Sequence, residues 1–410
     1  MSHAPVDPAH GVPRHPSEGS WIKPALPVAF CVLLVSAMAH LRVPLLPSIG
    51  DELSMSESRL GLAVTLFGVG RLAMDLPAGS LADRFRPLRL MAVSALVMGL
   101  GSAGVVAATQ PVMVMGAFLL LGAASATGNT TGMTSLIGAA PAHRRGSAMA
   151  LYSGCLLTGQ ALGPALSGVV ADLTGWRTAA AVGAGMGVVV AVLAFSWRPL
   201  HQGAQSPAGR RTSVSGPPLT ALQRNVAYGV GFGVFFTVGA MPQTLLPLIG
   251  SGELGLGVSA IGLAIGLGGL ARVVGAVGTG AVSDRISRRA ALMPCLLLQL
   301  GGVLVLAVDG GTPWWLAAIV LMSLGASAHA VAATVLADRV NPAELGRTLG
   351  RYRFAADVGL VAGPVLSATV YETAGRTAAV ATVAGILAFG SVAAAVLLPE
   401  TGPRHNRSGG

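Results

Sequence analysis

The chain has 410 residues, of which 53% are hydrophobic and only 10% charged, and its mean hydropathy is +0.70. This composition excludes an ordinary water-soluble enzyme and is typical of a protein that crosses a membrane several times. The formal net charge of +10 comes from arginines spread over many short segments rather than gathered in one stripe, so nucleic acid is not an expected partner.

Long apolar stretches recur along the whole chain. A helix needs about 20 residues to cross a bilayer, and only helices or closed barrels satisfy their backbone hydrogen bonds there. The stretches lack the alternation of barrel strands, which are about ten residues long. The expected spans are 24–46, 60–81, 89–109, 112–137, 147–170, 176–197, 225–249, 258–281, 290–309, 314–336, 346–370 and 376–398. They predict an all-α membrane protein of about twelve transmembrane helices in two six-helix halves.

Segments rich in proline, glycine and arginine flank and separate the two sets of spans. The predicted organisation is a disordered cytoplasmic tail 1–22, an N-terminal half 23–197, a cytoplasmic linker 198–224, a C-terminal half 225–398 and a cytoplasmic tail 399–410. Arginines gather in the loops on one side of the spans and acidic residues on the other, and basic loops stay in the cytoplasm. We therefore expect a multi-pass protein of the inner (cytoplasmic) membrane with both termini inside the cell.

The two halves share an internal repeat. When residues 60–84 are laid on 261–285, identical residues coincide at several positions, among them the pairs Gly61 with Gly262, Arg71 with Arg272, Gly79 with Gly280, Asp83 with Asp284 and Arg84 with Arg285. A parallel repeat of this kind implies substrate binding between the halves and alternating access by rocking of one half against the other.

The segment GSLADRFRPLR follows the second span and contains Gly79, Asp83 and Arg84. It matches the loop motif Gly-x-Leu-Ala-Asp-Arg of the major facilitator superfamily, which the chain resembles over nearly its whole length. A weaker copy with Asp284 and Arg285 follows the eighth span. The resemblance implies that these five residues form a conformational gate. The alternative for Asp83 is a solvated loop carboxylate.

The fifth span carries Gly159, Gly163, Pro164 and Gly168. This pattern is similar to a signature of antiporters in the superfamily, although the arginine typical of the fourth span of drug/proton antiporters is absent. The resemblance implies the bacterial twelve-helix drug/proton antiporter branch. Small residues also let helices approach closely, so packing is the alternative role of these glycines.

Five charged side chains fall in the inner parts of the expected spans, away from the span ends, where each costs about 2.5–3.5 kcal/mol and needs a partner or a water-filled cavity. Arg71 and Asp75 are four residues apart, as are Arg353 and Asp357, so each pair can form within its own helix. The family fold places the second span beside the eleventh, so pairing across the halves is the alternative. Asp75 and Asp357 are the leading candidates for a proton site.

The fifth charge, Arg272, has no acidic residue three or four positions away along its helix. We expect it either to contact an anionic or polar acceptor of the substrate or to replace the regulator of the proton site that the fourth span lacks. Hydrogen bonds to carbonyl groups of the fifth span are the structural alternative.

The resemblance implies a substrate cavity lined by the first, fourth, seventh and tenth spans. The middles of these spans contain no carboxylate, so strong selectivity for cations is not expected. Candidate lining residues are Ser36, Asn129, Tyr228, Phe236 and His329. Apolar walls with few polar anchors suit a small amphipathic organic compound. His329 is also a secondary candidate for carrying a proton.

The chain has no nucleotide-binding loop, no cluster with the spacing of metal ligands and no catalytic constellation, so neither an enzyme nor a cofactor is expected. We predict a monomer in the lipid bilayer that exports a drug or metabolite by proton-coupled alternating access. Uptake of a nutrient or metabolite by proton symport or facilitated diffusion is one alternative. A membrane receptor that transports nothing is another.

Overall fold

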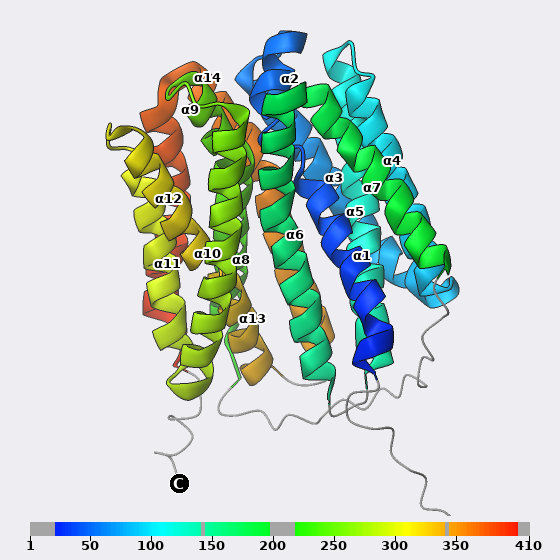
Figure 1. Ribbon diagram of the computed structural model, residues 1–410. Helices are drawn as coiled ribbons and strands as arrows, with labels where there is room; N and C mark the ends of the chain where they lie inside the picture. The colour runs from blue at the N-terminus through cyan, green and yellow to red at the C-terminus, as the bar shows by residue number, and fades with distance from the viewer. Residues whose placement is uncertain (1–20, 141–143, 197–217, 341–343, 401–410) are drawn as a thin grey trace, which may run out of the picture.

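The computed structural model describes residues 21–140, 144–196, 218–340 and 344–400, and all regular secondary structure in these ranges is helical. Nine of the helical stretches described are long and apolar enough to cross a membrane. The helices run side by side along one common direction (Figure 1). The predicted all-α membrane fold is confirmed.

The first half contains seven helical segments. They are α1 (Ile22–His40), α2 (Leu46–Leu53), α3 (Glu57–Arg84), α4 (Pro87–Val106), α5 (Pro111–Ala139), α6 (Arg145–Thr174) and α7 (Trp176–Ser196). Since α1 and α2 together form the first span, these segments give the six predicted spans.

The second half repeats this order. Its segments are α8 (Ala221–Ala240), the π-helical turn Met241–Leu245, α9 (Leu246–Gly252), α10 (Val258–Arg285), α11 (Arg288–Val305), α12 (Gly311–Gly325), α13 (Ala328–Arg339) and α14 (Leu345–Leu397). The long α14 holds two spans joined at Gly375, where a φ of 80° interrupts the helix. Glycine adopts this left-handed backbone without a steric penalty, which lets the chain reverse there.

The first span of each half is broken, whereas the sequence predicted one continuous helix. The turn 41–45 separates α1 from α2, and the turn Met241–Leu245 separates α8 from α9. Pro44 and Pro242 lie in these turns, and a proline has no N–H to donate and crowds the preceding turn of a helix. The breaks bring two polar side chains between the halves, as described below.

Each half has its own hydrophobic core. One buried cluster is built from residues of the first half and includes Leu248 from the second, and the other is built from the second half and includes Val43 from the first. Two separately packed units can move against each other without exposing either core. The predicted tails and linker fall largely outside the described residues.

The halves meet along two seams, one between α6 and α10 and the other between α3 and α14. Both bring backbones close together. A Cβ atom at Gly168 would lie 2.7 Å from the carbonyl oxygen of Val258, and one at Gly61 would lie 2.7 Å from that of Pro364. Glycine at these positions therefore permits a contact that any side chain would push apart.

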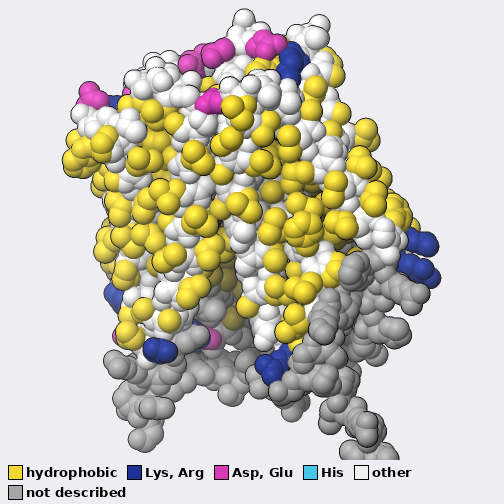
Figure 2. All heavy atoms as spheres, viewed as in Figure 1, with side chains coloured by type: hydrophobic (Ala, Val, Ile, Leu, Met, Phe, Trp, Pro, Cys, Tyr) yellow, Lys and Arg dark blue, Asp and Glu magenta, His cyan; other side chains and the backbone are white. Residues whose placement is uncertain are grey.

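One end of the molecule is acidic and the other basic, as Figure 2 shows for one face. The acidic end carries Asp51, Glu52, Glu57, Glu253, Asp309 and Glu372, and the basic end carries Arg84, Arg86, Arg89, Arg285, Arg289 and Arg347. This asymmetry agrees with the predicted charge distribution along the loops.

The seams are closed toward the acidic end and open toward the basic end. Ala161 of α6 packs against Gly269 of α10. Gly154 lies on the same face of α6, two turns nearer the basic end, and a Cβ atom there would meet nothing within 4 Å. On α14, Gly350 lies about three turns nearer the basic end than Val361, which packs against Gly68 across the other seam, and a Cβ atom at Gly350 would also meet nothing within 4 Å. The space between the halves therefore opens at the basic end.

Candidate functional site

A small cavity of about 50 Å³ lies between the halves. Its polar lining consists of His40 from α1, Gln160 from α6, Gln243 from the π-helical turn, Arg272 from α10 and Ser323 from α12. The cavity thus draws its polar groups from both halves, where alternating access requires a substrate site.

Arg272 crosses the α6–α10 seam. Its Nη1 donates to Oε1 of Gln160 over 3.1 Å, so the fifth span supplies a side-chain amide rather than the predicted backbone carbonyls. Arg272 also borders a second small cavity, beside Thr237 and Gln299. No salt bridge to Arg272 is present among the described residues. Its charge is therefore available to an anion in the cavity.

Arg42 is a second buried arginine between the halves, and the sequence analysis did not single it out. Its side chain is 4% exposed, its Nη2 donates to Oε1 of Gln243 over 2.7 Å, and its guanidinium lies 3.9 Å from the ring centre of Phe67. The signal was available, because Arg42 falls inside the expected span 24–46. Its position near the end of that span made it resemble a loop arginine.

These bonds orient the two glutamines. A guanidinium has only donors, so each glutamine turns its oxygen toward its arginine and its NH2 group away. The cavity wall therefore presents donors from Arg272, Gln160 and Gln243, and none of its lining residues is acidic. His40 lies within electrostatic reach of Arg42 and Arg272. Such a lining favours an acceptor-rich, negatively charged ligand.

The second group of intramembrane charges lies at the α3–α14 seam. Nε of Arg353 donates to Oδ2 of Asp357 over 3.1 Å, so the pair predicted within the eleventh span forms. Arg71 and Asp75 form no such bridge. Asp357 instead interacts with Arg71 and with Asp75 across the seam, and Asp75 interacts with Arg353. Arg353–Asp357 is thus the only one of the predicted pairs that forms a salt bridge among the described residues, and direct pairing across the halves stays a prediction.

The carboxyl groups of Asp75 and Asp357 lie within electrostatic reach of each other across the seam, and Oδ2 of Asp75 is buried without a hydrogen-bond partner. Two carboxylates offer only acceptors, so a hydrogen bond between these groups would require a proton on one of them. One carboxyl comes from each half, and the hydroxyl of Tyr152 on α6 lies within electrostatic reach of Asp75. The role of Asp75 and Asp357 in binding a proton stays a prediction.

Two of the predicted cavity residues are buried in helix packing, and a contact of either one with substrate stays a prediction. Ser36 is 1% exposed and donates to the carbonyl oxygen of Leu156 over 2.7 Å. Phe236 is 1% exposed and packs beside Phe232, with ring centres 5.8 Å apart. A transmembrane helix has one side toward the cavity and others against neighbouring helices or lipid. The sequence did not indicate which side of the first and seventh spans faces the cavity.

The other predicted cavity residues are half-buried. Asn129 has a buried Oδ1 with no hydrogen-bond partner, and Tyr228 packs against the core of the second half. Nδ1 of His329 lies 2.7 Å from the carbonyl oxygen of Ala326, beside the break between α12 and α13, and its ring meets Phe235 edge to face at 5.1 Å. A contact with substrate at these positions stays a prediction.

The glycines of the fifth span are packing residues. A Cβ atom at Gly163 would lie 2.5 Å from the carbonyl oxygen of Ala37, and Gly159 approaches the same helix at Leu33. Gly168 contacts α10 across the seam, and the carbonyl oxygen of Pro164 touches Gly262 there. These contacts join helices by close approach, as the alternative interpretation predicted.

The predicted gate residues lie at the basic ends of α3 and α10. Arg84 and Arg285 end these helices and are exposed. The side chains of Asp83 and Asp284 lie outside what the structure describes, and so do the surroundings of Gly79. Their gating role stays a prediction.

Carboxylates join the helices at the acidic end. Glu52 bonds Arg177 at 2.7 Å and Glu253 bonds Arg376 at 2.8 Å, each within its own half. A hydrogen bond at this end crosses the halves, because the backbone N–H of Ser58 donates to Glu372 over 2.7 Å. Hydrogen bonds from Ser58 hold the pKa of Glu372 below its usual range. Glu372 thereby caps the N-terminus of α3 from the opposite half.

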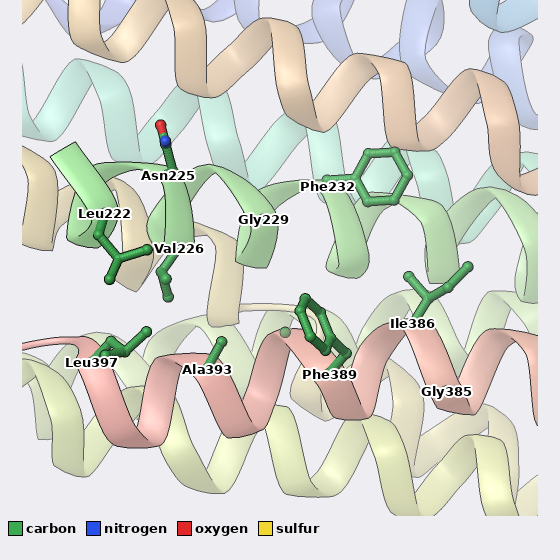
Figure 3. Close-up of a pocket in the computed structure, with 11 residues that line it drawn as sticks. Leu222, Asn225, Val226, Gly229, Phe232, Gly385, Ile386, Phe389, Ala393 and Leu397 are labelled. Atoms are coloured by element: carbon green, nitrogen blue, oxygen red, sulfur yellow. The ribbon is translucent and has the colours of Figure 1, made fainter.

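A larger groove of about 660 Å³ runs between α8 and the last part of α14 (Figure 3). Leu222 and Val226 point toward Ala393 and Leu397 across it. Its lining is almost entirely apolar, and Phe389 at its rim is 79% exposed, so the groove belongs to the apolar outer surface. It lacks the polar groups that would orient a substrate.

Comparisons with known proteins agree with this architecture. The family model of the Major Facilitator Superfamily matches residues 28–308 and 229–410. A hexuronate transporter of Bacillus subtilis (strain 168) is 24% identical over 406 residues, which are 90% of this chain and 94% of the relative.

Two solved structures share the fold at low sequence identity. A D-xylose-proton symporter has a TM-score of 0.75 and 15% identity, with 93% of this chain and 98% of that chain covered. The human organic anion transporter MFSD10 (TETRAN) has a TM-score of 0.64 and 19% identity, with 92% and 100% covered.

Proposed function

The chain belongs to the Major Facilitator Superfamily, and on that basis we propose that it takes up a small organic anion carrying hydroxyl groups, with protons as the coupling ion. The observation that carries the proposal is Arg272, which lies between the halves in a cavity walled by donors. A carboxylate fits the planar donor pair of a guanidinium. Hydroxyl oxygens fit the free NH2 groups of Gln160 and Gln243.

The relatives support this substrate class. A hexuronate is a sugar bearing a carboxylate, and the hexuronate transporter matches nearly the whole chain. The organic anion transporter shares the fold. Both names agree with a cavity that lacks acidic lining residues.

Family membership makes the chain a membrane transporter and not an enzyme. The drug/proton antiporter branch and multidrug efflux, which the fifth-span motif had implied, have no support in these relatives. The glycines of that motif serve packing in this structure, and so give no indication of transport direction. Uptake, the alternative interpretation of the sequence, therefore becomes the proposal.

The geometry suggests how the cycle runs. The substrate carboxylate binds Arg272 at the α6–α10 seam and takes the place of Gln160 as its acceptor, because a charged acceptor forms the stronger hydrogen bond. A proton bound between Asp75 and Asp357 neutralises one carboxylate at the α3–α14 seam. Rocking of the halves then exposes both sites to the other side of the membrane.

Transport into proteoliposomes tests the proposal. The parent protein is expected to accumulate labelled D-glucuronate under an inward proton gradient, and to transport D-glucose poorly because it offers no charge to Arg272. Arg272→Gln should lower the initial rate at least tenfold, since a charged hydrogen bond contributes about 1.5–3 kcal/mol. Arg272→Lys should be intermediate, because it keeps the charge but loses the planar fork.

Arg224→Gln is a matched control that removes one positive charge outside the cavity. Arg224 lies 3.6 Å from Glu344 at the surface, and such exposed pairs contribute little. Its rate should equal that of the parent. Absence of uptake of D-glucuronate and D-gluconate, together with raised resistance of expressing cells to amphipathic drugs, would replace the proposal by efflux.

A further inference from the structure

Two guanidinium–amide bonds cross between the halves in opposite directions. Arg42 of the first half donates to Gln243 of the second, and Arg272 of the second half donates to Gln160 of the first. Both glutamines line the same cavity. Only one of the two arginines lines it, because Arg42 lies behind Gln243.

The environment of Arg42 does not explain its presence by packing alone. Its guanidinium lies over the ring of Phe67 and 5.3 Å from the ring centre of Phe118, which favours a cation. Its Nε and Nη1 atoms are nevertheless buried without a hydrogen-bond partner. A buried charge with unsatisfied donors destabilises a protein, so an apolar residue here would be the more stable choice.

What Arg42 provides is a fixed direction for the amide of Gln243. An amide can rotate by half a turn and present either its oxygen or its NH2 group to the cavity. Because Arg42 offers only donors, Gln243 must turn its oxygen toward Arg42 and its NH2 group toward the cavity. Gln243 is 9% exposed, so its amide is desolvated and the choice of direction is strongly favoured.

We infer that Gln243 is a substrate-binding residue and that Arg42 is its positioning residue. Gln243 donates to an oxygen of the anion whose carboxylate lies on Arg272, and Arg42 acts on the substrate only through Gln243. The inference rests on the proposed function and narrows it. The substrate is an acid with a second acceptor oxygen placed to reach the opposite half.

A double-mutant cycle on the purified full-length protein tests this, with D-glucuronate binding measured by calorimetry. Gln243→Ala should weaken binding about tenfold. Arg42→Gln should weaken it several-fold in the parent, because the amide is then free to turn, and should change it less than twofold in the Gln243→Ala background. Gln243→Glu should weaken binding more than Gln243→Ala does, since it turns a donor into a negatively charged acceptor.

Thermal unfolding separates positioning from a purely structural role. Arg42→Gln removes an incompletely paired buried charge, so its unfolding temperature should not fall while its affinity does. Arg42→Lys, which keeps a charge there, serves in its place should the glutamine variant fail to fold. It should also lose affinity, because a single ammonium does not reproduce the contact with Gln243.

The outcomes are distinguishable. Binding of D-glucuronate by the parent, with equal weakening by Arg42→Gln in both backgrounds, would overturn the inference and leave the proposed function standing. A parent that binds neither D-glucuronate nor D-gluconate would overturn both.

Discussion

The charged residues described between the halves divide between the two seams: Arg272 lies at the α6–α10 seam, and Arg71, Asp75, Arg353 and Asp357 lie at the α3–α14 seam. Arg272 and its repeat mate Arg71 occupy equivalent positions on α10 and α3. Opposite Arg272, α6 carries Gln160, and at the equivalent position α14 carries Leu360. The same backbone thus holds an anion-binding chemistry at one seam and an acidic pair at the other.

The acidic pair leads to a prediction for the coupling ion. Asp75→Asn or Asp357→Asn should abolish accumulation of D-glucuronate driven by a proton gradient. Each variant keeps only one of the two carboxyl groups, so the pair can no longer share a proton. Exchange of labelled for unlabelled substrate, which needs no net proton movement, should persist. Proteoliposomes that carry out both assays provide the measurement. Gradient-driven accumulation unchanged in both variants would remove the pair from coupling.

The sequence identified the charged residues within the spans, but it did not indicate which residues surround them. The charges at 71, 75, 272, 353 and 357 could be found because charges are rare in apolar spans. The burial of Ser36 and Phe236 against neighbouring helices could not be predicted, since the rotation of a helix about its axis depends on its neighbours. The direct partner of Arg272 could not be predicted either, because Gln160 is more than a hundred residues away in the chain.

At the scale of helices, the breaks in the first and seventh spans and the glycine contacts at the seams determine how the halves meet. Proline at 44 and 242 could have indicated the breaks, but a proline within a span is equally compatible with a simple kink. The number and order of helices followed from apolar length alone. Which helices form the seams came from the family resemblance rather than from any pattern in the residues.

The closed seam gives a prediction for the conformational equilibrium. Gly168→Val places a side chain 2.7 Å from the carbonyl oxygen of Val258, so it should force the acidic end open. Spin labels on cysteines at Leu173 and Gly252, one in each half, should then lie farther apart than in the parent protein when measured by double electron–electron resonance. Gly154→Ala is the matched control on the same helix, because its Cβ atom meets empty space. Equal distances in both variants would show that Gly168 does not control closure.

At the scale of the whole molecule, the separation of charge between the two ends predicts the orientation in the membrane. A cysteine at Gly252, at the acidic end, should react with a membrane-impermeant reagent in intact cells. One at Phe85, at the basic end, should react only after permeabilisation. The background should lack the native cysteines Cys31, Cys155 and Cys295. Labelling of position 85 but not 252 from outside would invert the topology.

The distribution of chemistry over two seams has a consequence for leakage. Substrate and proton do not touch in this arrangement. No direct contact between them therefore prevents the halves from rocking when only one of the two is bound. Strict symport then depends on the energy of each half-loaded form during the turn: an empty Arg272 or a doubly charged Asp75–Asp357 pair must be costly to occlude. The number of protons transported per substrate therefore depends on the energy barriers between conformational states. A mutation at either seam can change this number without altering the affinity of the other site.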